Sequence, residues 1–491
     1  MKLDDPSACD LKTICDLATE LLAHEERSPV RPYLEPDELA DRLDLALGPE
    51  GQALEPLLAT LRQLWDATPR ISSRRFFNQL FGGRDPVATL AEVLVVLANT
   101  PMHTFKAAGA QVLVEQEVLQ HMAGFVGYDD GEGMFTAGGS LSNLAGMILA
   151  RNEALPGVRD DGLTAHPERL CVYTSAEGHF SIARALGMTG LGRHNARSVP
   201  IDGAGRMRAG ALRQLIDRDL RQGHRPMMIN ATVATTVLGA FDPLRELAEV
   251  AAEHGLWLHV DGAYGGSVLL SDRHRHLLDG CELADSFSWD AHKALGVPLS
   301  CSVLLVRRRG LLRKHFGEEA GYLFQTHDDH NPAQRSMQCA RRNDALKLWT
   351  AWKHHGDAGY AQRIDRLFAL AQLGAERVRA DPELRLCQPP ASFNVCFEVA
   401  GCCSVEICER LERESRLVVS HVEVDGQRWI RLVCIHQDLT EADLDVFFDE
   451  VKTVARAIRA ERGMASEAAP ELPIDTSIDE PVDEPLGVPS A

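Results

Sequence analysis

Hydrophobic residues recur at helical spacing in the first part of the chain. Over roughly the first 70 residues, apolar positions three and four residues apart alternate with polar ones, which predicts amphipathic helices. We therefore predict a helical N-terminal segment over residues 1–100. The clearest apolar stripe consists of Leu54, Leu57, Leu58, Leu61 and Leu64. We interpret it as a packing face with no catalytic or binding role.

From about residue 100, short apolar runs alternate with helical stretches. This alternation is typical of an α/β fold with a mainly parallel sheet and helices on both faces, here over residues 101–345. Ligands of such sheets bind beyond the carboxyl ends of the strands, so we expect the chemistry in the loops that follow them. Buried strands are predicted over residues 169–173, 226–231, 257–260, 286–289 and 302–306.

One helix between these strands has clear signals at both ends. Asp242 is placed to cap a helix that runs to about His254, and Pro243 suits the first helical position, where no amide donor is needed. Gly255 stands where a left-handed terminator belongs, and the strand over 257–260 follows at once.

The pattern then changes to that of a smaller α+β domain, over residues 346–464. Two alternating segments, 392–398 and 428–434, predict strands, and Thr440 is a good cap for the long helix that follows. The last stretch is rich in Pro, Asp and Glu and has few large apolar residues, so we predict a disordered acidic tail over 465–491.

The composition is that of a soluble globular protein: 491 residues, of which 45% are hydrophobic and 25% charged. The formal net charge of −20 argues against a nucleic-acid partner, because it repels a phosphate backbone. The N-terminus has no apolar signal region, and no apolar run is long enough to span a membrane. The 12 cysteines form no CxxC pair and no metal-type spacing. We predict a cytoplasmic protein with no metal and no membrane partner.

Two segments at predicted strand ends carry charged candidates. Lys293 follows the strand over 286–289. Burial would penalise its charge and so lower its pKa. An amine of lowered pKa can form a Schiff base with a carbonyl. Taken alone, Lys293 is better interpreted as a surface lysine. Asp261 ends the strand over 257–260 and precedes small residues. Its carboxylate can pair with the ring nitrogen of pyridoxal phosphate or, equally, cap the following turn.

Two more segments complete a pattern. The glycines and serine of FTAGGSLSN precede a helix over 144–152, whose free amides and dipole attract phosphate, although such turns are common. His179 follows another strand and can stack on an aromatic cofactor, whereas a lone histidine is usually structural. Each ordinary interpretation is tolerable by itself. The occurrence of all four on successive strand ends favours a pyridoxal-phosphate site.

The motifs resemble those of the group II pyridoxal-phosphate decarboxylases, which act on glutamate, cysteine sulfinate and aromatic amino acids. The resemblance runs from roughly Arg70 to Phe448 and implies the fold type I of pyridoxal-phosphate-dependent transferases. The motifs are FNQL, FTAGGSLSN, SAEGHFS, ATVATTVLGAFDP, HVDGAYGG, WDAHK, VPLSCSVLLVRR and QCARRNDALKLW.

The resemblance also implies roles for single residues. Lys293 would form the covalent bond to the cofactor, pyridoxal 5'-phosphate, while Asp261 pairs with its ring nitrogen and His179 stacks on the ring. Arg431 matches the arginine that binds a substrate carboxylate. The family is dimeric, with the active site at the subunit interface. Further cofactor contacts are implied for Ala263 on the opposite ring face and, around the phosphate, for Gly139, Ser140, His292, Thr235 or Thr236, and Asp290, whose position is often Asn in the family.

The FNQL segment is similar to the glutamate and cysteine-sulfinate branch. There, Gln79 would contact the acidic end of the substrate; a packing role is the alternative. The resemblance thus implies decarboxylation of an acidic L-amino acid, namely glutamate, aspartate or cysteine sulfinate, to the amine and CO2.

The chain departs from the family at the mobile loop that supplies a tyrosine to protonate the carbanion. The matching stretch, residues 323–338, contains no tyrosine, and Tyr322 belongs to the preceding anchor. His327 or His330 is the candidate replacement. Without one, an oxidative deamination or transamination path becomes an alternative outcome.

Three other positions also depart from the family. Ala234 stands where the family usually has Gly, and Lys106 and Gly109 stand where the glutamate branch has Glu and Pro. Two alternatives therefore remain beside the acidic substrate: another amino acid such as 2,4-diaminobutyrate, and an inactive regulatory homologue. The intact cofactor residues argue against the second.

Overall fold

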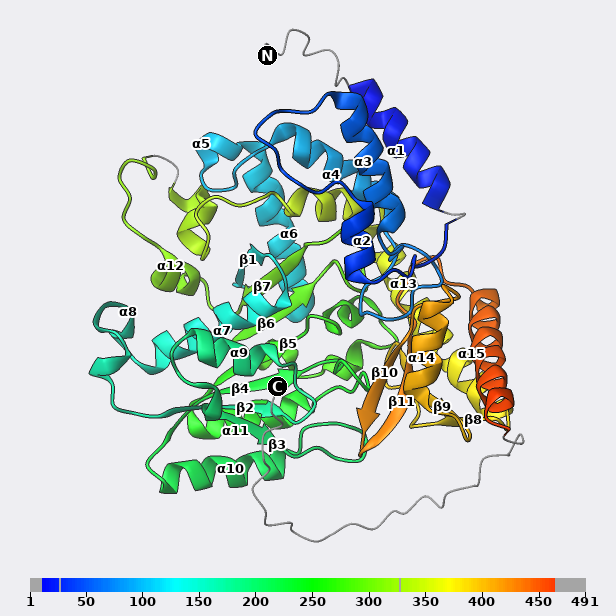
Figure 1. Cartoon of the computed structure of the whole chain (residues 1–491). Coiled ribbons are helices and arrows are strands. Elements are labelled where there is room, and N and C mark those ends of the chain that lie inside the picture. The colour runs from blue at the N-terminus through cyan, green and yellow to red at the C-terminus, as the bar shows by residue number, and fades with distance from the viewer. Residues whose placement is uncertain (1–10, 26–27, 326–327, 464–491) are drawn as a thin grey trace.

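The structure is a computed structural model, and it describes residues 11–25, 28–325 and 328–463 (Figure 1). Its centre is a seven-stranded sheet in the order β1-β7-β6-β5-β4-β2-β3. The strands from β3 to β6 in this order are parallel, whereas β7 is antiparallel to both β6 and β1, so the predicted mainly parallel sheet is confirmed with one reversed strand. The strands are β1 (Glu132–Thr136), β2 (Leu170–Ser175), β3 (Ala196–Val199), β4 (Arg225–Thr232), β5 (Trp257–Asp261), β6 (Ser286–Asp290) and β7 (Ser302–Val306).

Alternate side chains of each strand enter two apolar layers, one on each face of the sheet. In β2, Cys171 and Tyr173 join the layer that includes α6, α10, α11 and α13, while Leu170 and Val172 join the layer of α7 and α9. Helices therefore cover both faces, as predicted. The helices of this unit are α6 (Ala110–Val126), α7 (Gly139–Ala154), α8 (Val158–Asp161), α9 (Ser181–Met188), α10 (Ala209–Arg221), α11 (Leu244–His254) and α12 (Leu311–Phe316).

A smaller antiparallel sheet, in the order β10-β11-β9-β8, forms a second core with three helices, which lie beside the large sheet in Figure 1. The long helix α13 serves both cores: Leu348 packs in the large one and Ala375 in the small one, and Gly356 (φ 66°) kinks the helix between them. Thr440 caps α15 as predicted. The elements are α13 (Ala345–Ala380), β8 (Leu384–Leu386), β9 (Asn394–Val399), α14 (Ser404–Arg413), β10 (Ser420–Val424), β11 (Gln427–Val433) and α15 (Glu441–Glu461).

The N-terminal segment is helical, but its leucine stripe is not buried by this chain. Leu57 and Leu61 are exposed, and no residue of α3 is fully buried. The expected packing face therefore has no complete partner within the described part of the chain. The helices are α1 (Leu11–Glu25), α2 (Pro36–Arg42), α3 (Leu54–Ala67), α4 (Pro86–Ala98) and α5 (Phe105–Ala108).

The predicted cap of α11 is wrong. The helix begins at Leu244 with Pro243 as its N-cap, so it starts one residue later than expected. The buried carboxylate of Asp242 instead accepts hydrogen bonds from the backbone N–H groups of Met207 (2.7 Å) and Thr232 (2.8 Å). Burial raises its pKa to about 6. Asp242 thus ties a neighbouring turn to the end of β4 rather than capping a helix.

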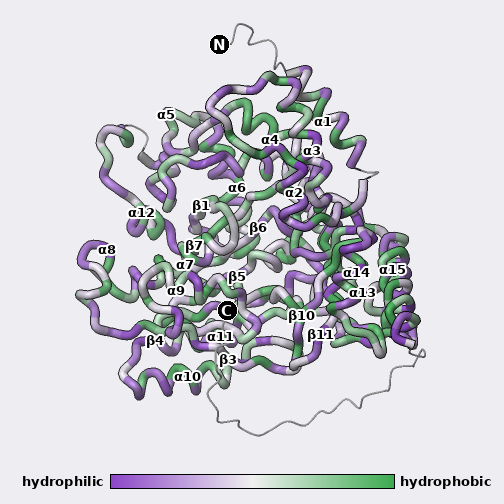
Figure 2. The backbone as a smooth tube through the Cα atoms, viewed as in Figure 1, coloured by the Kyte–Doolittle hydropathy of each residue, from purple (hydrophilic) through white to green (hydrophobic). Residues whose placement is uncertain are grey.

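Peripheral helices switch between hydrophobic and hydrophilic positions along their length, as expected for helices with one buried face (Figure 2). Within residues 11–25, 28–325 and 328–463, no helix has the length and apolar character needed to cross a membrane. The predicted disordered tail over 465–491 lies outside the described residues.

Candidate active site

Lys293 lies just beyond β6, at the carboxyl edge of the parallel strands. Its Nζ is 3.4 Å from Oδ2 of Asp290, the last residue of β6, whose side chain is almost completely buried. A hydrogen bond from Ser302 Oγ holds the other carboxylate oxygen, and Ser302 is linked to Ser142 at 3.1 Å. The reversed strand β7 supplies Ser302, so the sheet topology itself positions the acid beside the lysine.

His292 is buried beside the same carboxylate oxygen of Asp290. Its Nε2 is 3.5 Å from Asp290 Oδ2, and its Nδ1 lies 2.9 Å from the backbone carbonyl oxygen and 3.1 Å from the backbone nitrogen of Cys301. Burial lowers the pKa of His292. Two basic groups, one amine and one imidazole, therefore face a single carboxylate at this edge.

Asp261 ends the fully buried strand β5, next to β6. Its Oδ1 accepts hydrogen bonds from the backbone N–H of Ala263 (3.2 Å) and the hydroxyl of Ser288 (3.3 Å). Its Oδ2 accepts one from Asn143 Nδ2 at 2.7 Å. This oxygen keeps a second lone pair for another donor.

The loop between β1 and α7 approaches this acid cluster closely. Gly138 has φ 148°, a conformation that essentially only glycine adopts. A Cβ on Gly139 would lie 2.8 Å from Asp290 Oδ2 and 3.0 Å from the Cβ of Ala263, so only glycine fits there. Ser140 follows in the first turn of α7, a helix of 16 residues whose positive dipole end points toward this edge.

His179 lies within the same electrostatic neighbourhood. Its ring is half-buried, and its Nδ1 accepts a hydrogen bond from the backbone N–H of Ser181 at 3.3 Å. Burial lowers its pKa, and the charges of Asp261, Lys293 and Asp290 all act on it. The structure thus gathers His179, Asp261, Asp290 and Lys293 at the carboxyl ends of three strands, β2, β5 and β6.

Arg431 packs against the loop after β4. The Arg431 guanidinium is buried and donates to the carbonyl oxygens of Thr236 and Asn78, at 2.8 Å each. Gln79, next to Asn78, is exposed. Thr235 is buried, and its hydroxyl accepts a hydrogen bond from the N–H of Ala240, which closes the loop, whereas the Thr236 side chain is partly exposed.

The departures from the family motifs have structural counterparts. Ala234 has φ 61°, in the left-handed region that favours glycine. Gly109, between α5 and α6, has φ 52°, which the fixed φ of proline excludes, and Lys106 is exposed. Tyr322 is 84% exposed, and the ring of His330 packs edge-on against Phe105.

His327, the other candidate donor, lies outside the described residues.

Three site residues were not singled out from the sequence: Asn143, Ser288 and Ser302, which hold the two acids. All three lie inside or beside the motifs, Asn143 at the end of FTAGGSLSN and Ser302 within VPLSCSVLLVRR. The available signal was a polar residue in an otherwise apolar element, because a buried polar group must be hydrogen-bonded.

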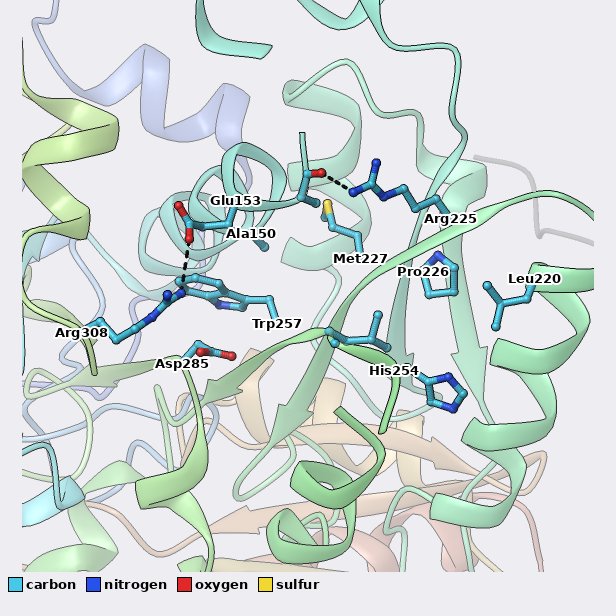
Figure 3. A pocket seen from close by; sticks show the side chains of 13 residues that line it. Ala150, Glu153, Leu220, Arg225, Pro226, Met227, His254, Trp257, Asp285 and Arg308 are labelled. Atoms are coloured by element: carbon cyan, nitrogen blue, oxygen red, sulfur yellow. Dashed lines mark hydrogen bonds and ion pairs between the residues drawn. The ribbon is translucent and has the colours of Figure 1, made fainter. Parts of the chain in front are cut away.

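A cavity of about 470 Å³ lies elsewhere, at the amino ends of β4 and β5 (Figure 3). Its wall includes Arg308, which is 3.4 Å from Glu153 and lies over the Trp257 ring, and Arg225, which donates to a backbone carbonyl. Arg308 is thus paired with Glu153, Arg225 with Glu168 and Asp285 with Arg307. None of the predicted site residues lines this cavity.

One cluster beside β2 has the spacing of a metal site: ligand atoms of Cys171, Asp219 and His224 lie within 4.8 Å of one another. The guanidinium of Arg197 already lies among them, donating to Asp219 at 2.9 Å and to the Cys171 sulfur at 3.0 Å. A cation is therefore already supplied by the chain itself.

The residues at the carboxyl edge fit pyridoxal phosphate. Lys293 provides an amine for the aldehyde, and Asp261 has a free lone pair for the ring nitrogen. The glycine loop and the start of α7 provide amides for the phosphate. The close approach of Gly139 to Asp290 and Ala263 leaves no room for a larger side chain at position 139.

Comparisons with known proteins agree. Residues 36–400 match the family described as "Pyridoxal-dependent decarboxylase conserved domain". The chain is 37% identical to human cysteine sulfinic acid decarboxylase over 86% of this chain and 90% of that protein. It is 34% identical to mouse acidic amino acid decarboxylase GADL1, over 89% and 83%. The crystal structure of mouse CSAD superposes with a TM-score of 0.86 and 34% identity, covering 91% of this chain and 99% of that one.

The fold, the carboxyl-edge site and these similarities converge, and the chain belongs to the pyridoxal-dependent decarboxylase family, with pyridoxal 5'-phosphate as its cofactor.

Proposed function

We propose that the chain decarboxylates an acidic L-amino acid, such as cysteine sulfinate, aspartate or glutamate, to the amine and CO2. The observation that carries this proposal is the guanidinium of Arg431. It is buried, its Nε has no hydrogen-bond partner among the described residues, and no described carboxylate pairs with it. A buried unpaired cation is costly, so it is suited to an anionic ligand. The names of the two relatives, which specify acidic substrates, support the same class.

The proposed roles at the cofactor are those that the family motifs imply, and the position of the residues at the carboxyl edge supports them. Lys293 would hold the cofactor, Asp261 would keep the ring nitrogen charged, and His179 and Ala263 would lie against the ring. The phosphate would be held at the start of α7. Its proposed neighbours are Gly139, Ser140, His292, Thr235 or Thr236, and Asp290.

When bound, the cofactor supplies a ring that accepts the electrons of the bond to the substrate carboxylate. The chain's own groups prepare that step. Asp290, 3.4 Å from Lys293 Nζ, takes up or returns the amine proton as the lysine is exchanged for substrate. The neutral His179 gives an uncharged stacking face, since burial lowers its pKa. Arg431 binds the carboxylate and Gln79 the acidic side chain. His330 or His327 is the proposed proton donor.

We also propose a cytoplasmic homodimer with the active site at its interface. Helix α4 exposes five large apolar residues, four of which lie at helical spacing: Leu90, Val93, Leu94 and Leu97, with Val96 as the fifth. The helix starts beside the lysine loop, because the N–H of Asp85 donates to the carbonyl oxygen of Gly296 at 2.9 Å. A second copy docked on α4 would therefore lie next to Lys293. A cytoplasmic location is supported by the described cysteines, which are all free.

The proposed domain limits are 1–100, 101–345, 346–464 and 465–491.

The test is a product screen. Cofactor-loaded protein is incubated with the twenty amino acids, cysteine sulfinate and 2,4-diaminobutyrate, and products are identified by mass together with CO2 and hydrogen peroxide. Amines and CO2 from acidic substrates alone are expected. Aldehyde with peroxide would replace the proposal by oxidative deamination, and preference for diaminobutyrate would overturn the acidic substrate class and the role of Gln79 in binding an acidic side chain.

A further inference from the structure

A continuous line of hydrogen bonds crosses the buried centre of the large sheet behind Asp261. The indole N–H of Trp257 donates to Ser286 Oγ at 2.8 Å, and Ser286 Oγ is 2.8 Å from His259 Nδ1. His259 Nε2 is 3.0 Å from Asn143 Oδ1, and Asn143 Nδ2 donates to Asp261 Oδ2 at 2.7 Å. All five side chains are buried.

The chemistry of the two ends fixes the direction of every bond in this line. The Asp261 carboxylate only accepts, so Asn143 must turn its amide nitrogen toward it and its oxygen toward His259. His259 must then carry its proton on Nε2, which leaves Nδ1 to accept from the Ser286 hydroxyl. The indole of Trp257 only donates, and it does so to Ser286. The neutral Nε2–H form of His259 satisfies every group, whereas the other tautomer would oppose two lone pairs at Asn143.

The surroundings hold His259 in this form. A Cβ on Gly146 would lie 2.8 Å from Nδ1, so α7 packs directly on the imidazole ring. Burial lowers the pKa of His259, and Asp261 is the charged group that acts against that shift. The outer end of the line, Trp257, lies in the wall of the cavity of Figure 3. Because an indole does not ionise, the line is not a path for protons and acts by orientation.

Asn143 makes one more contact. Its amide nitrogen also donates to Ser181 Oγ at 3.0 Å, and the backbone N–H of Ser181 donates to His179 Nδ1 at 3.3 Å. Asn143 itself is on α7, four residues after Gly139. One amide thus links the helix of the glycine loop, the segment of the stacking histidine and the acid of β5.

We propose that Asn143 and His259 are positioning residues that set the orientation and the charge of Asp261 for the cofactor ring. His259 fixes which way the Asn143 amide points, and Asn143 delivers an N–H to one lone pair of Asp261 Oδ2, leaving the other for the ring nitrogen. The inference rests on the role of Asp261 stated under the proposed function. In addition, the hydrogen bonds of Asn143 and His259 would keep the Asp261 carboxylate ionised and hold it in one orientation.

The first experiment measures the tautomer of His259 in the full chain without cofactor, by nitrogen NMR of histidine-labelled protein at pH 7, with His259→Gln to assign the signal. The expected result is a neutral ring protonated on Nε2. A ring protonated on Nδ1, or a charged ring, would overturn the proposal irrespective of whether the enzyme decarboxylates anything.

The second experiment compares variants by their dissociation constant for pyridoxal phosphate and by the visible absorption band of the bound cofactor. His259→Leu and Asn143→Ala are expected to weaken cofactor binding about tenfold or more and to shift the band. His259→Gln, which keeps a donor and an acceptor, is expected to recover most of the affinity. The matched control is Asn152→Ala, a buried asparagine on the same helix outside the line, with an affinity within about twofold of the original chain.

Wild-type affinity and an unshifted band in folded His259→Leu would overturn the proposal. If His259→Leu does not fold, Ser286→Ala and the tautomer measurement decide it. Failure of the proposed function looks different: the original chain would bind cofactor with the expected dependence on Asn143 and His259 but would release no CO2 from any acidic amino acid.

Discussion

The two edges of the seven-stranded sheet differ in how their polar groups are satisfied. At the amino edge a cavity of about 470 Å³ is open, yet Arg308 is paired with Glu153, and Arg225 donates to the carbonyl oxygen of Ala154 (Figure 3). At the carboxyl edge, Lys293, Asp290 and Asp261 are buried or nearly so, and small residues bring them together. Space alone therefore does not mark the active site; costly buried charges do.

The difference arises from strand direction and from β7. Parallel strands end together, so the residues that follow them meet at one edge, and the reversed β7 brings Ser302 to the same place to hold Asp290. The amino edge receives strand starts, where Arg225 and Trp257 begin β4 and β5 and surface ion pairs suffice. Paired substitutions at the two edges test this contrast.

The largest effect is expected for Lys293→Ala against Lys314→Ala. Loss of the Lys293 amine should reduce kcat/KM on the order of 10⁴-fold or more, because the covalent route is lost. Lys314 pairs with Glu153 at the amino edge, and its loss should leave kcat/KM within about twofold. Steady-state kinetics on both variants decides it, and equal losses would remove the contrast between the edges.

Asp261→Asn should lower kcat on the order of 10²–10³-fold, since a neutral amide cannot hold a positive charge on the ring nitrogen. Its counterpart at the amino edge is Asp285→Asn. Asp285 accepts from the backbone N–H of Leu258 and pairs with Arg307, so its neutralisation should affect stability and leave kcat of the folded enzyme within about threefold. Similar kcat losses in both variants would contradict the assignment.

Arg431→Lys keeps the charge but loses the planar donor set. For an acidic substrate we expect KM to rise about 30-fold, equivalent to about 2 kcal/mol, with a smaller change in kcat. The control is Arg308→Lys at the amino edge, for which KM should not change. An unchanged KM in Arg431→Lys would show that the substrate carboxylate binds elsewhere.

The stability of the cofactor-free chain should depend on pH through His259. Burial lowers its pKa from 6.5 to about 4. Between these values the unfolded chain binds a proton that the folded chain excludes, so folding stability falls as the pH decreases from 6.5 toward 4. Between pH 7.5 and pH 5 the loss should be smaller in His259→Gln, by up to about 2 kcal/mol. Urea unfolding at the two pH values measures the free energy of unfolding. An identical loss in both proteins would show that His259 can take up a proton in the folded chain.

The smallest effect concerns the loop after β4. Ala234 has φ 61°, a conformation that costs an alanine about 1 kcal/mol and glycine almost nothing. Ala234→Gly is therefore expected to raise the free energy of unfolding by up to about 1 kcal/mol. Calorimetry measures the unfolding temperature of Ala234→Gly. A lower unfolding temperature than that of the original chain would show that packing of the alanine methyl stabilises the fold by more than the backbone strain costs.

Much of the fold was predictable because strands and helices leave separate periodicities in the sequence. The five predicted strands of the large unit are all present, and Gly255 ends α11 in the left-handed conformation as expected. The N-cap of α11 was predicted wrongly. Asp242 accepts hydrogen bonds from two buried backbone N–H groups instead, and these groups belong to other segments of the chain. Local rules cannot include such partners.

The same limit applies to the site. The motifs identified Lys293, Asp261 and His179 as candidates, and the structure brings their charges within reach of one another. Asn143 and Ser302 escaped notice because their importance depends on the register of β7 and on the packing of α7 over β5. The exposed leucines of α3 show the converse, because an amphipathic stripe predicts a buried face without saying which chain buries it.

One measurement tests the central claim most directly, namely that Lys293 at the carboxyl edge carries the cofactor. Cofactor-loaded protein is reduced with borohydride, digested and mapped by mass spectrometry, with Lys293→Ala treated in parallel. A reduced pyridoxyl group on the peptide that contains Lys293, and no labelled peptide in Lys293→Ala, is the predicted result. The same label on Lys347, Lys314 or any other lysine of the original chain would contradict the account.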